Sequence, residues 1–315
     1  MLEKGAFLFL YTLTPLHAGT EQSLGFVDLP LQRERITGFP IIQASELKGK
    51  LRSLAAVKSG TDEEHGKKVM VTFGHDKESA SEYAGSISIS DARVLLFPVR
   101  SLKGVFAWVT CEAVLTRFCR DLMIIGDTSW SPPALSLKNQ DIAVAGDSIL
   151  CLNNSIVLEE FTFNVRKGDN DLVRELGERL KGYLPREGLH THFTNSLTER
   201  LAVVPDDAFY YFVQFATEIV TRIALDSEKK VVREHALWNE EYLPSETLLY
   251  ATCFATKPRA PKCSLPAEWN NAPSADHILS FVKELADNKC FQLGGDETTG
   301  KGLVAASVYR PGEGG

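Results

Sequence analysis

The glycine-rich segment near the C-terminus contains residue types that could bind a phosphate. The run from Gly295 to Lys301 matches the first seven positions of a P-loop, in which backbone amides and a lysine hold nucleotide phosphates. Gly302 stands where Ser or Thr would hold magnesium, and Asp296 and Glu297 would repel a phosphate. Too few residues follow for the rest of a nucleotide-hydrolysing domain. The pattern argues against an NTPase and leaves either a backbone loop that approaches another segment closely or a tight turn between strands.

A second candidate phosphate site is the helix that follows the long N-terminal loop. Ser45 stands at the expected N-cap, and Lys48 and Arg52 lie on one helical face because four residues separate them. The helix N-terminus and these two cations could clamp consecutive phosphates of a nucleic acid. A solvated helix face is the alternative, and the spacing alone favours it.

The charge balance limits the size of any nucleic-acid site. The 315 residues are 44% hydrophobic and 24% charged, as in an ordinary globular protein, and the net charge is −7. Such a balance argues against a broad basic face. Residues 1–60 hold seven Lys or Arg and five Asp or Glu, a net charge of +2. A nucleic-acid site should therefore be a local groove near the N-terminal third.

The remaining composition indicates a cytoplasmic protein. No apolar run is long enough to span a membrane, and the N-terminus lacks the basic region and cleavage site of a signal peptide. The six cysteines show no CxxC spacing, which excludes the usual zinc and redox motifs and favours reduced, mostly buried thiols.

The expected elements alternate without a strict βαβ rhythm, which predicts an α+β fold in a single domain over residues 1–315. The sequence pattern predicts strands at 6–14, 86–97, 105–110, 156–165 and 247–256, helices at 45–58, 111–123, 169–183 and 277–288, and a hairpin of 219–225 with 230–233. Residues 208–215 form a buried segment of either type. Residues 59–84 are predicted to be a mobile insertion with little β-branched content, and the loop at 17–40 is long enough to be functional.

An ordered series of motifs spans nearly the whole chain. It consists of LHAGT (16–20), VDLPLQRERITGFPII (27–42), SELKGKLR (45–52), FPVRSLKGVFAWVT (97–110), ALWNEEYLP (236–244) and LGGDETTGKG (293–302). The series resembles the backbone subunits of the type III-B CRISPR (Cmr) effector complexes, within the RAMP superfamily. The resemblance implies a ferredoxin-like (RRM-like) core with insertions and a protruding β-hairpin thumb, placed at about residues 203–240. It also implies guide crRNA, target RNA, other Cmr subunits and further copies of the chain as partners, with no membrane partner.

The resemblance further implies a metal-dependent endoribonuclease that cuts target RNA to a 2′,3′-cyclic phosphate. Asp28 matches the family's loop aspartate and is the expected catalytic residue and ligand of a divalent metal, Mg²⁺ above all. His17 either transfers a proton or contacts guide RNA. Glu240 and Glu241 either assist catalysis or only cap and salt-bridge a strand connection. A subunit that binds RNA without cutting it is the alternative function, and a guide-processing nuclease ranks lower.

The same resemblance assigns the guide RNA contacts. They are expected at Ser45, Lys48 and Arg52 of the helix, at Gly294, Gly295, Thr299, Gly300, Lys301 and Gly302 of the glycine loop, and at Arg33 and Arg35. Both arginines flank the catalytic loop, so the alternative is an ion pair with Glu34 or with a neighbouring subunit. The loop at 17–37 and the thumb are expected to be poorly fixed in an isolated subunit.

Overall fold

The computed structural model describes residues 3–20, 25–59, 62–75, 83–131, 134–185, 191–225 and 232–313. Its described strands form a 12-stranded, mostly antiparallel sheet and a separate two-stranded hairpin. The sheet contains β1 (Lys4–Thr12), β2 (Ile41–Ile42), β3 (Ile87–Ile89), β4 (Ala92–Arg100), β5 (Phe106–Cys111), β6 (Asp141–Val144), β7 (Ser155–Leu158), β8 (Phe161–Val165), β9 (Leu201–Val204), β12 (Leu248–Ala255), β13 (Lys289–Gln292) and β14 (Leu303–Tyr309). The strand order is β13-β14-β1-β12-β4-β5-β9-β6-β8-β7, with β2 beside β4 and β3 beside β12.

Strand β1 lies inside the sheet, between β12 and β14. Helices contact it as well, α3 (Glu112–Ile125) and α8 (Ala275–Ala286), so that little of the strand reaches solvent. Seven consecutive residues of β1 are buried, which explains why this strand is a continuous apolar run rather than an alternating one. Phe7 of β1 stacks on Phe118 of α3 with ring centroids 5.3 Å apart.

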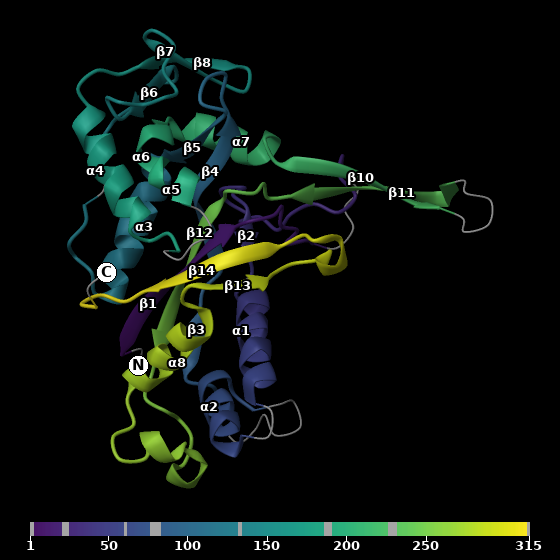
Figure 1. Cartoon of the computed structure of the whole chain (residues 1–315), viewed down its shortest axis with the longest axis vertical. Helices are drawn as coiled ribbons and strands as arrows, with labels where there is room; N and C mark the ends of the chain where they lie inside the picture. The colour runs from purple at the N-terminus through teal and green to yellow at the C-terminus, as the bar shows by residue number, and fades with distance from the viewer. Residues whose placement is uncertain are drawn as a thin grey trace.

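The other helices surround the sheet at its two ends (Figure 1). They are α1 (Ala44–Ser59), α2 (Glu63–Phe73), α4 (Asn170–Lys181), α5 (Thr191–Asn195), α6 (Leu197–Arg200) and α7 (Asp206–Phe215). Helices α1, α2 and α8 lie at the end of the molecule that holds the N-terminus, whereas β6, β7 and β8 lie at the opposite end. None of the described helices is long and apolar enough to cross a bilayer.

The structure corrects one helix prediction and assigns two segments whose secondary structure the sequence analysis had not predicted. Within the predicted insertion at 59–84, residues 63–73 form α2, because the Asp62 side chain accepts hydrogen bonds from two first-turn amides. Helix α1 begins at Ala44, whose amide donates to Asp91 Oδ1 at 2.8 Å, so Ser45 is not the N-cap. The buried segment at 208–215 is α7, in which Phe209, Phe212 and Val213 recur at helical spacing. Residues 60–61 and 76–82, which complete the predicted mobile insertion, lie outside the described residues.

Two strand predictions are also refined. The strand predicted at 156–165 is a hairpin of β7 and β8, which turns at Glu159 with φ of 49°. The glycine loop at 294–302 connects β13 to β14, and its 3₁₀ turn (Glu297–Thr299) is followed by a strand, so no P-loop helix is present there. The predicted alternative of a turn between strands is confirmed.

The two-stranded hairpin projects from the body of the molecule (Figure 1). It consists of β10 (Glu218–Leu225) and β11 (Val232–Tyr242), paired antiparallel with Thr221 opposite Asn239. The predicted second strand, 230–233, is therefore too short. The hairpin also covers fewer residues than the predicted span of 203–240, which includes the end of β9 and all of α7. The predicted connection at 226–229 lies outside the described residues.

Candidate active site

One edge of strand β11 and the residue that follows it hold the long N-terminal loop near its start and near its middle. The Leu29 amide donates to Asn239 O, and the Glu241 amide donates to Leu29 O, each at 3.0 Å. Two residues further along, Leu16 and Leu243 exchange a pair of backbone hydrogen bonds of 2.9 and 2.8 Å. The loop is thus attached at the base of the hairpin, where it places His17 and Asp28 beside one strand.

Asp28 is partly exposed and is held by one of its two carboxylate oxygens. Oδ2 accepts a 2.8 Å hydrogen bond from the Asn239 amide of β11. For Oδ1 the structure records no partner within the described part of the chain. A carboxylate with one fixed and one open oxygen has a defined orientation and can still accept a proton or share a cation.

The orientation of His17 determines which ring nitrogen can react. Nδ1 lies 2.7 Å from Glu241 O, and a backbone carbonyl can only accept, so Nδ1 carries the hydrogen. In the neutral ring, Nε2 is therefore the basic nitrogen. The ring also packs beside Tyr242, with centroids 5.4 Å apart. Because residues 239 and 241 are two apart on an extended strand, the backbone groups that hold Asp28 and His17 are separated by roughly 7 Å.

The glycine loop covers His17 from the other side. The Gly295 amide donates to His17 O at 3.0 Å, and the Gly302 amide donates to Pro15 O at 2.8 Å. Gly294 has φ of 77°, and a Cβ there would lie 2.4 Å from His17 O, so a side chain would push the two segments apart. The predicted close approach of this loop to another backbone is confirmed, and that backbone is the N-terminal segment.

Glu240 is saturated by partners at the hairpin base. Its carboxylate accepts from Arg222 Nε at 2.9 Å, from Trp238 Nε1 at 2.7 Å and from the Tyr242 hydroxyl. Burial opposes the charged form, but the hydrogen bonds from Tyr242, Trp238 and Arg222 outweigh it and lower the pKa of Glu240 to about 2. With this pKa, Glu240 stays ionised and cannot exchange a proton near neutral pH. The geometry favours the salt-bridging alternative over a catalytic one.

Glu241 is equally occupied and fixes the loop. Oε1 accepts from Arg33 at 2.6 Å and from Thr217 at 2.8 Å, and Oε2 accepts from the Leu31 amide at 2.9 Å. The predicted pairing of Arg33 with Glu34 is wrong for the described residues, since Glu34 accepts from Arg117 instead. Arg35, by contrast, is exposed and stays a predicted RNA contact.

The face of α1 that lines a groove is not the predicted one. Lys48 donates to Ile87 O at 3.3 Å and Arg52 donates to His75 O at 3.3 Å, so both point toward the segment around β3. Burial, together with Arg52 and Arg259, lowers the pKa of Lys48. The helix side chains in the groove are Glu46, Lys50 and Ser53.

This groove, of about 590 Å³, lies between α1 and the glycine loop. His17, Gly294 and Gly295 line its other side. Burial raises the pKa of Glu46, although the Gly294 amide and His17 oppose the rise. Lys50 is the cation that the sequence analysis missed, and its spacing four residues after Glu46 in the same helix was the available signal.

The remaining predicted guide contacts lie in different places, some of them at the hairpin base and one at the start of α1. Lys301 Nζ lies 4.9 Å from the centre of the Tyr242 ring, and the Thr299 hydroxyl donates to Asp296 O at 2.9 Å. Gly300 is exposed, whereas Gly302 is buried and Ser45 is exposed at the start of α1. The structure brings Thr299 and Lys301 to the hairpin base and leaves Ser45 outside the set of groove-lining residues.

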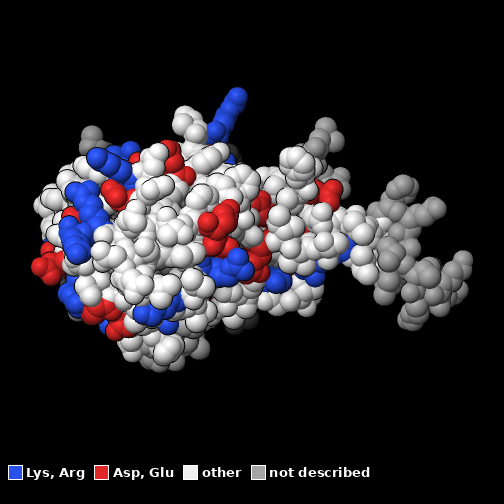
Figure 2. Space-filling model, turned by 90° about the horizontal axis from the view of Figure 1, so that it is seen from above, with Lys and Arg blue, Asp and Glu red and all other residues white. Residues whose placement is uncertain are grey.

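Figure 2 shows that positive and negative side chains alternate over the face seen from above. Long stretches of other residues separate them, and no broad basic field covers this face. The distribution agrees with the net charge of −7, which predicted a local site rather than a basic surface.

Comparison with known proteins decides the family. A model of the RAMP superfamily matches residues 9–305. The chain is 39% identical over 308 residues to the CRISPR system Cmr endoribonuclease Cmr4 of Pyrococcus furiosus, covering 97% of this chain and 96% of the relative. The chain belongs to the Cmr4 family of the RAMP superfamily.

Two further comparisons agree with the Cmr4 family. The CRISPR system CMR subunit Cmr4 of Saccharolobus solfataricus is 29% identical over 311 residues, with 94% of each chain covered. The crystal structure of oligomeric Cmr4 from Pyrococcus furiosus is similar with a TM-score of 0.71 and 32% identity, covering 98% of both chains. Similarity over nearly the full length shows that the family relationship includes the loop, the hairpin and the glycine turn.

The donor set around Asp28 limits how this Cmr4-family chain could hold a metal. Within the described ranges, no group of three or more His, Cys, Asp or Glu side chains could form a metal site. Asp28 could therefore supply a single carboxylate. Magnesium is often bound through one or two carboxylates together with substrate phosphates and water, and Asp28 fits that mode only.

Phe26 is a residue that the sequence analysis missed. Its ring is 105% exposed, two residues before Asp28 on the same loop. Exposed aromatic rings can stack on nucleobases, which makes Phe26 a candidate base contact on the loop of Asp28. An aromatic residue between Gly25 and Asp28 in a polar loop was the signal that could have indicated it.

Proposed function

We propose that this chain is the repeating backbone subunit of a type III-B CRISPR effector complex and that it cuts target RNA paired to the guide. The observation that carries the proposal is the attachment of Asp28 and His17 to one edge of β11, two residues apart. The name of the Pyrococcus furiosus relative, an endoribonuclease of a CRISPR system, supports the reaction class. The oligomeric form of that relative supports contacts between copies of this chain.

The arrangement supports a transesterification within the RNA. His17 Nε2 accepts the proton of a ribose 2′-hydroxyl, and the 2′-oxygen attacks the adjacent phosphorus. The bond to the 5′-oxygen breaks, which leaves a 2′,3′-cyclic phosphate and a 5′-oxygen that takes up a proton. Asp28 orients the reacting nucleotide through its open oxygen. When bound, a divalent cation would neutralise part of the charge on the phosphate.

The finer features of the fold complete the proposal. The β10–β11 hairpin is the thumb, and the strands around β1 with α1 and α8 form the ferredoxin-like core. The guide backbone lies along the groove of Lys50 and the glycine loop, whose backbone amides approach the RNA, and His17 at the end of this groove faces the target strand. Target sequence is then read by pairing with the guide, as in other RNA-guided complexes.

The test is cleavage of a labelled target RNA by the guide-loaded complex, with magnesium and with a chelator. Asp28→Asn keeps an acceptor for the Asn239 amide and removes the charge. We expect regularly spaced cuts in the wild type and their loss in the variant, with target binding retained. Unchanged cuts in an assembled Asp28→Asn complex would favour the non-catalytic scaffold, and equal cutting in chelator would contradict the metal requirement.

A further inference from the structure

We infer that the buried pair of Arg33 and Glu241 is a positioning device that fixes the candidate catalytic loop on the hairpin base. The inference rests on the proposed function and deepens it, because it moves Arg33 from the RNA contacts to the supports of the reacting groups. The side chains of Arg33 and Glu241 are 18% and 7% exposed, with Nη2 and Oε1 2.6 Å apart.

Glu241 joins three separate segments. Its carboxylate accepts from Leu31 and Arg33 of the loop and from Thr217, which precedes β10. Its own carbonyl accepts from His17 Nδ1, and its amide donates to Leu29 O. A single residue therefore fixes the loop on both sides of Asp28 in the chain and orients His17 as well.

Three of the five N–H groups of Arg33 donate to other parts of the protein. Nη1 donates to Gly38 O and to Val213 O, each at 2.9 Å, and Nη2 donates to Glu241. Val213 lies in α7, so the guanidinium ties the loop to the helix that leads into the hairpin. Three such bonds fix the orientation of the guanidinium, and its loss would leave the Glu241 carboxylate without its cation.

The consequence is a mechanical link between the hairpin and the reacting groups. Thr217 and Glu241 lie at the start and the end of the hairpin, and both are bonded within this cluster. A displacement of the hairpin base would move Leu31, and with it the short segment that carries Asp28. Misplacement of a reacting group by about 1 Å can reduce a rate by about 10²-fold without weakening substrate binding.

The experiment compares Arg33→Met, Glu241→Gln and the double variant in the guide-loaded complex. The readouts are the single-turnover cleavage rate and the affinities for guide and target at several salt concentrations. We expect each single variant to lose about 10²-fold in rate with affinities within about twofold, and the double variant to be no slower than either single one. A weaker guide affinity with a salt slope reduced by about one would show Arg33 to be a phosphate contact and would overturn the inference.

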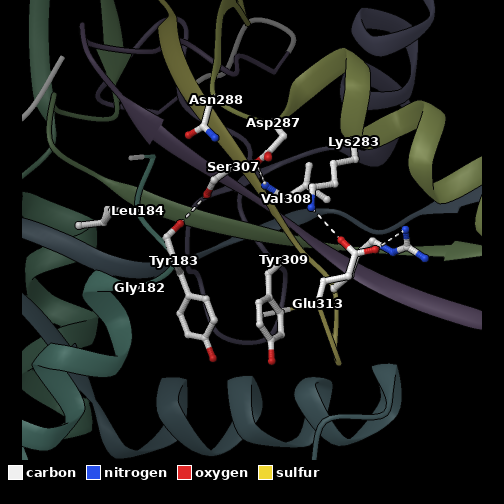
Figure 3. Close-up of a pocket in the computed structure, with 11 residues that line it drawn as sticks. Gly182, Tyr183, Leu184, Lys283, Asp287, Asn288, Ser307, Val308, Tyr309 and Glu313 are labelled. Atoms are coloured by element: carbon white, nitrogen blue, oxygen red, sulfur yellow. Dashed lines mark hydrogen bonds and ion pairs between the residues drawn. The ribbon is translucent and has the colours of Figure 1, made fainter. Parts of the chain in front are cut away.

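Arg310, directly after the end of β14, provides a matched control. Arg310 is 11% exposed and pairs with Asp276 at 2.6 Å and with Glu313 at 2.7 Å. It lines the small cavity of Figure 3, where Lys283 also pairs with Glu313. Arg310→Met removes an equally buried guanidinium outside the candidate site, so we expect no change in the cleavage rate. A rate loss as large as that of Arg33→Met would indicate general destabilisation and would overturn the inference.

Arg33→Lys keeps the test decisive if Arg33→Met does not assemble. A lysine can keep the ion pair with Glu241, but its single ammonium group cannot also donate to the carbonyls of Gly38 and Val213. We therefore expect an intermediate cleavage rate. A wild-type rate in an assembled Arg33→Lys complex would overturn the positioning role. Asp28→Asn is measured in parallel, because unchanged cutting there would contradict the proposed function rather than this inference.

Discussion

Strand β11 presents two kinds of carboxylate environment. Glu240 and Glu241 belong to the strand itself, are 6% and 5% exposed, and have every carboxylate oxygen bonded. Asp28 is attached to the same strand from the loop, is partly exposed and keeps one oxygen open. Acidic residues attached to one strand can thus have opposite roles, because saturation by partners makes a carboxylate structural and an open oxygen keeps it available.

The largest expected effect is at His17, which is attached to β11 beside the available carboxylate of Asp28. In His17→Asn, the amide can keep the hydrogen bond to Glu241 O but has no titratable nitrogen. We expect cleavage by the guide-loaded complex to fall by about 10²–10⁴-fold, the usual contribution of a general base. The measurement is the single-turnover cleavage rate of the wild type and the variant at pH 7, with guide and target affinities measured in parallel. Loss of guide affinity with an unchanged rate would indicate instead that His17 only contacts RNA.

Glu240→Gln tests the structural role of a carboxylate whose oxygens are both hydrogen-bonded. Removing the charge leaves Arg222 without its nearest carboxylate, so we expect the free energy of unfolding to fall by about 2–3 kcal/mol at pH 7. Glu268→Gln is the control, because the exposed pair of Glu268 with Lys68 should contribute less than about 1 kcal/mol.

The pH dependence of the same variant sharpens the test. The pKa of Glu240 is lowered from 4.5 to about 2, so the folded state binds fewer protons than the unfolded state between these values. The stabilisation is complete above about pH 4.5 and is lost as the pH falls toward 2. Denaturant unfolding at pH 7, 4.5 and 3 should show the difference between wild type and variant shrinking. A constant difference would contradict the assignment.

Phe26→Ala tests whether the exposed aromatic ring on the loop of Asp28 stacks on a nucleobase. Loss of one aromatic stack costs about 1–3 kcal/mol, so we expect a 5- to 150-fold weaker target affinity or higher KM. Tyr or Trp at position 26 should restore binding. Ile36, which is 96% exposed on the same loop, provides the control variant Ile36→Ala. Equal effects of the two alanine variants would show that exposed apolar area, not stacking, is responsible.

The smallest expected effect concerns a carboxylate that is buried without partners. Burial raises the pKa of Glu246 from 4.5 to about 7, and the structure records no partner for its buried Oε2. The folded state therefore binds more protons than the unfolded state, and stability declines as the pH rises from about 4.5 to 7. We expect Glu246→Gln to raise the free energy of unfolding by about 1 kcal/mol at pH 8, after allowance for partial solvent access, and to have little effect at pH 4. A destabilising effect at pH 8 would contradict this.

The sequence predicts the functionally important segments better than it predicts the role of each side chain. The loop, the first helix and the glycine turn are found from local patterns, because glycine spacing and helical periodicity act over a few residues. The roles of Arg33 and Glu240 depend on partners 208 and 18 residues away, which no local pattern specifies. Helical spacing relates Lys48 to Arg52, but only their tertiary hydrogen bonds, to Ile87 of β3 and to His75 after α2, show that both point away from the groove.

The same limit explains the elements that were missed. Helix α2 is rich in charge and contains Gly66, and its position depends on a single side-chain cap at Asp62. Strand β13 has only four residues and owes its conformation to pairing with β14. Short elements that are fixed by neighbours have weak propensities of their own, so tertiary contacts determine them.

The hydrogen bond that orients His17 has an evolutionary consequence. Its acceptor is the main-chain carbonyl of residue 241 and not a side chain. Every amino acid supplies that oxygen, so the tautomer of the imidazole tolerates mutation at this position as long as the strand keeps its path. Selection on the orientation of this ring would then act mainly on backbone geometry, whereas a change of the side chain at 241 would release the loop that carries Asp28.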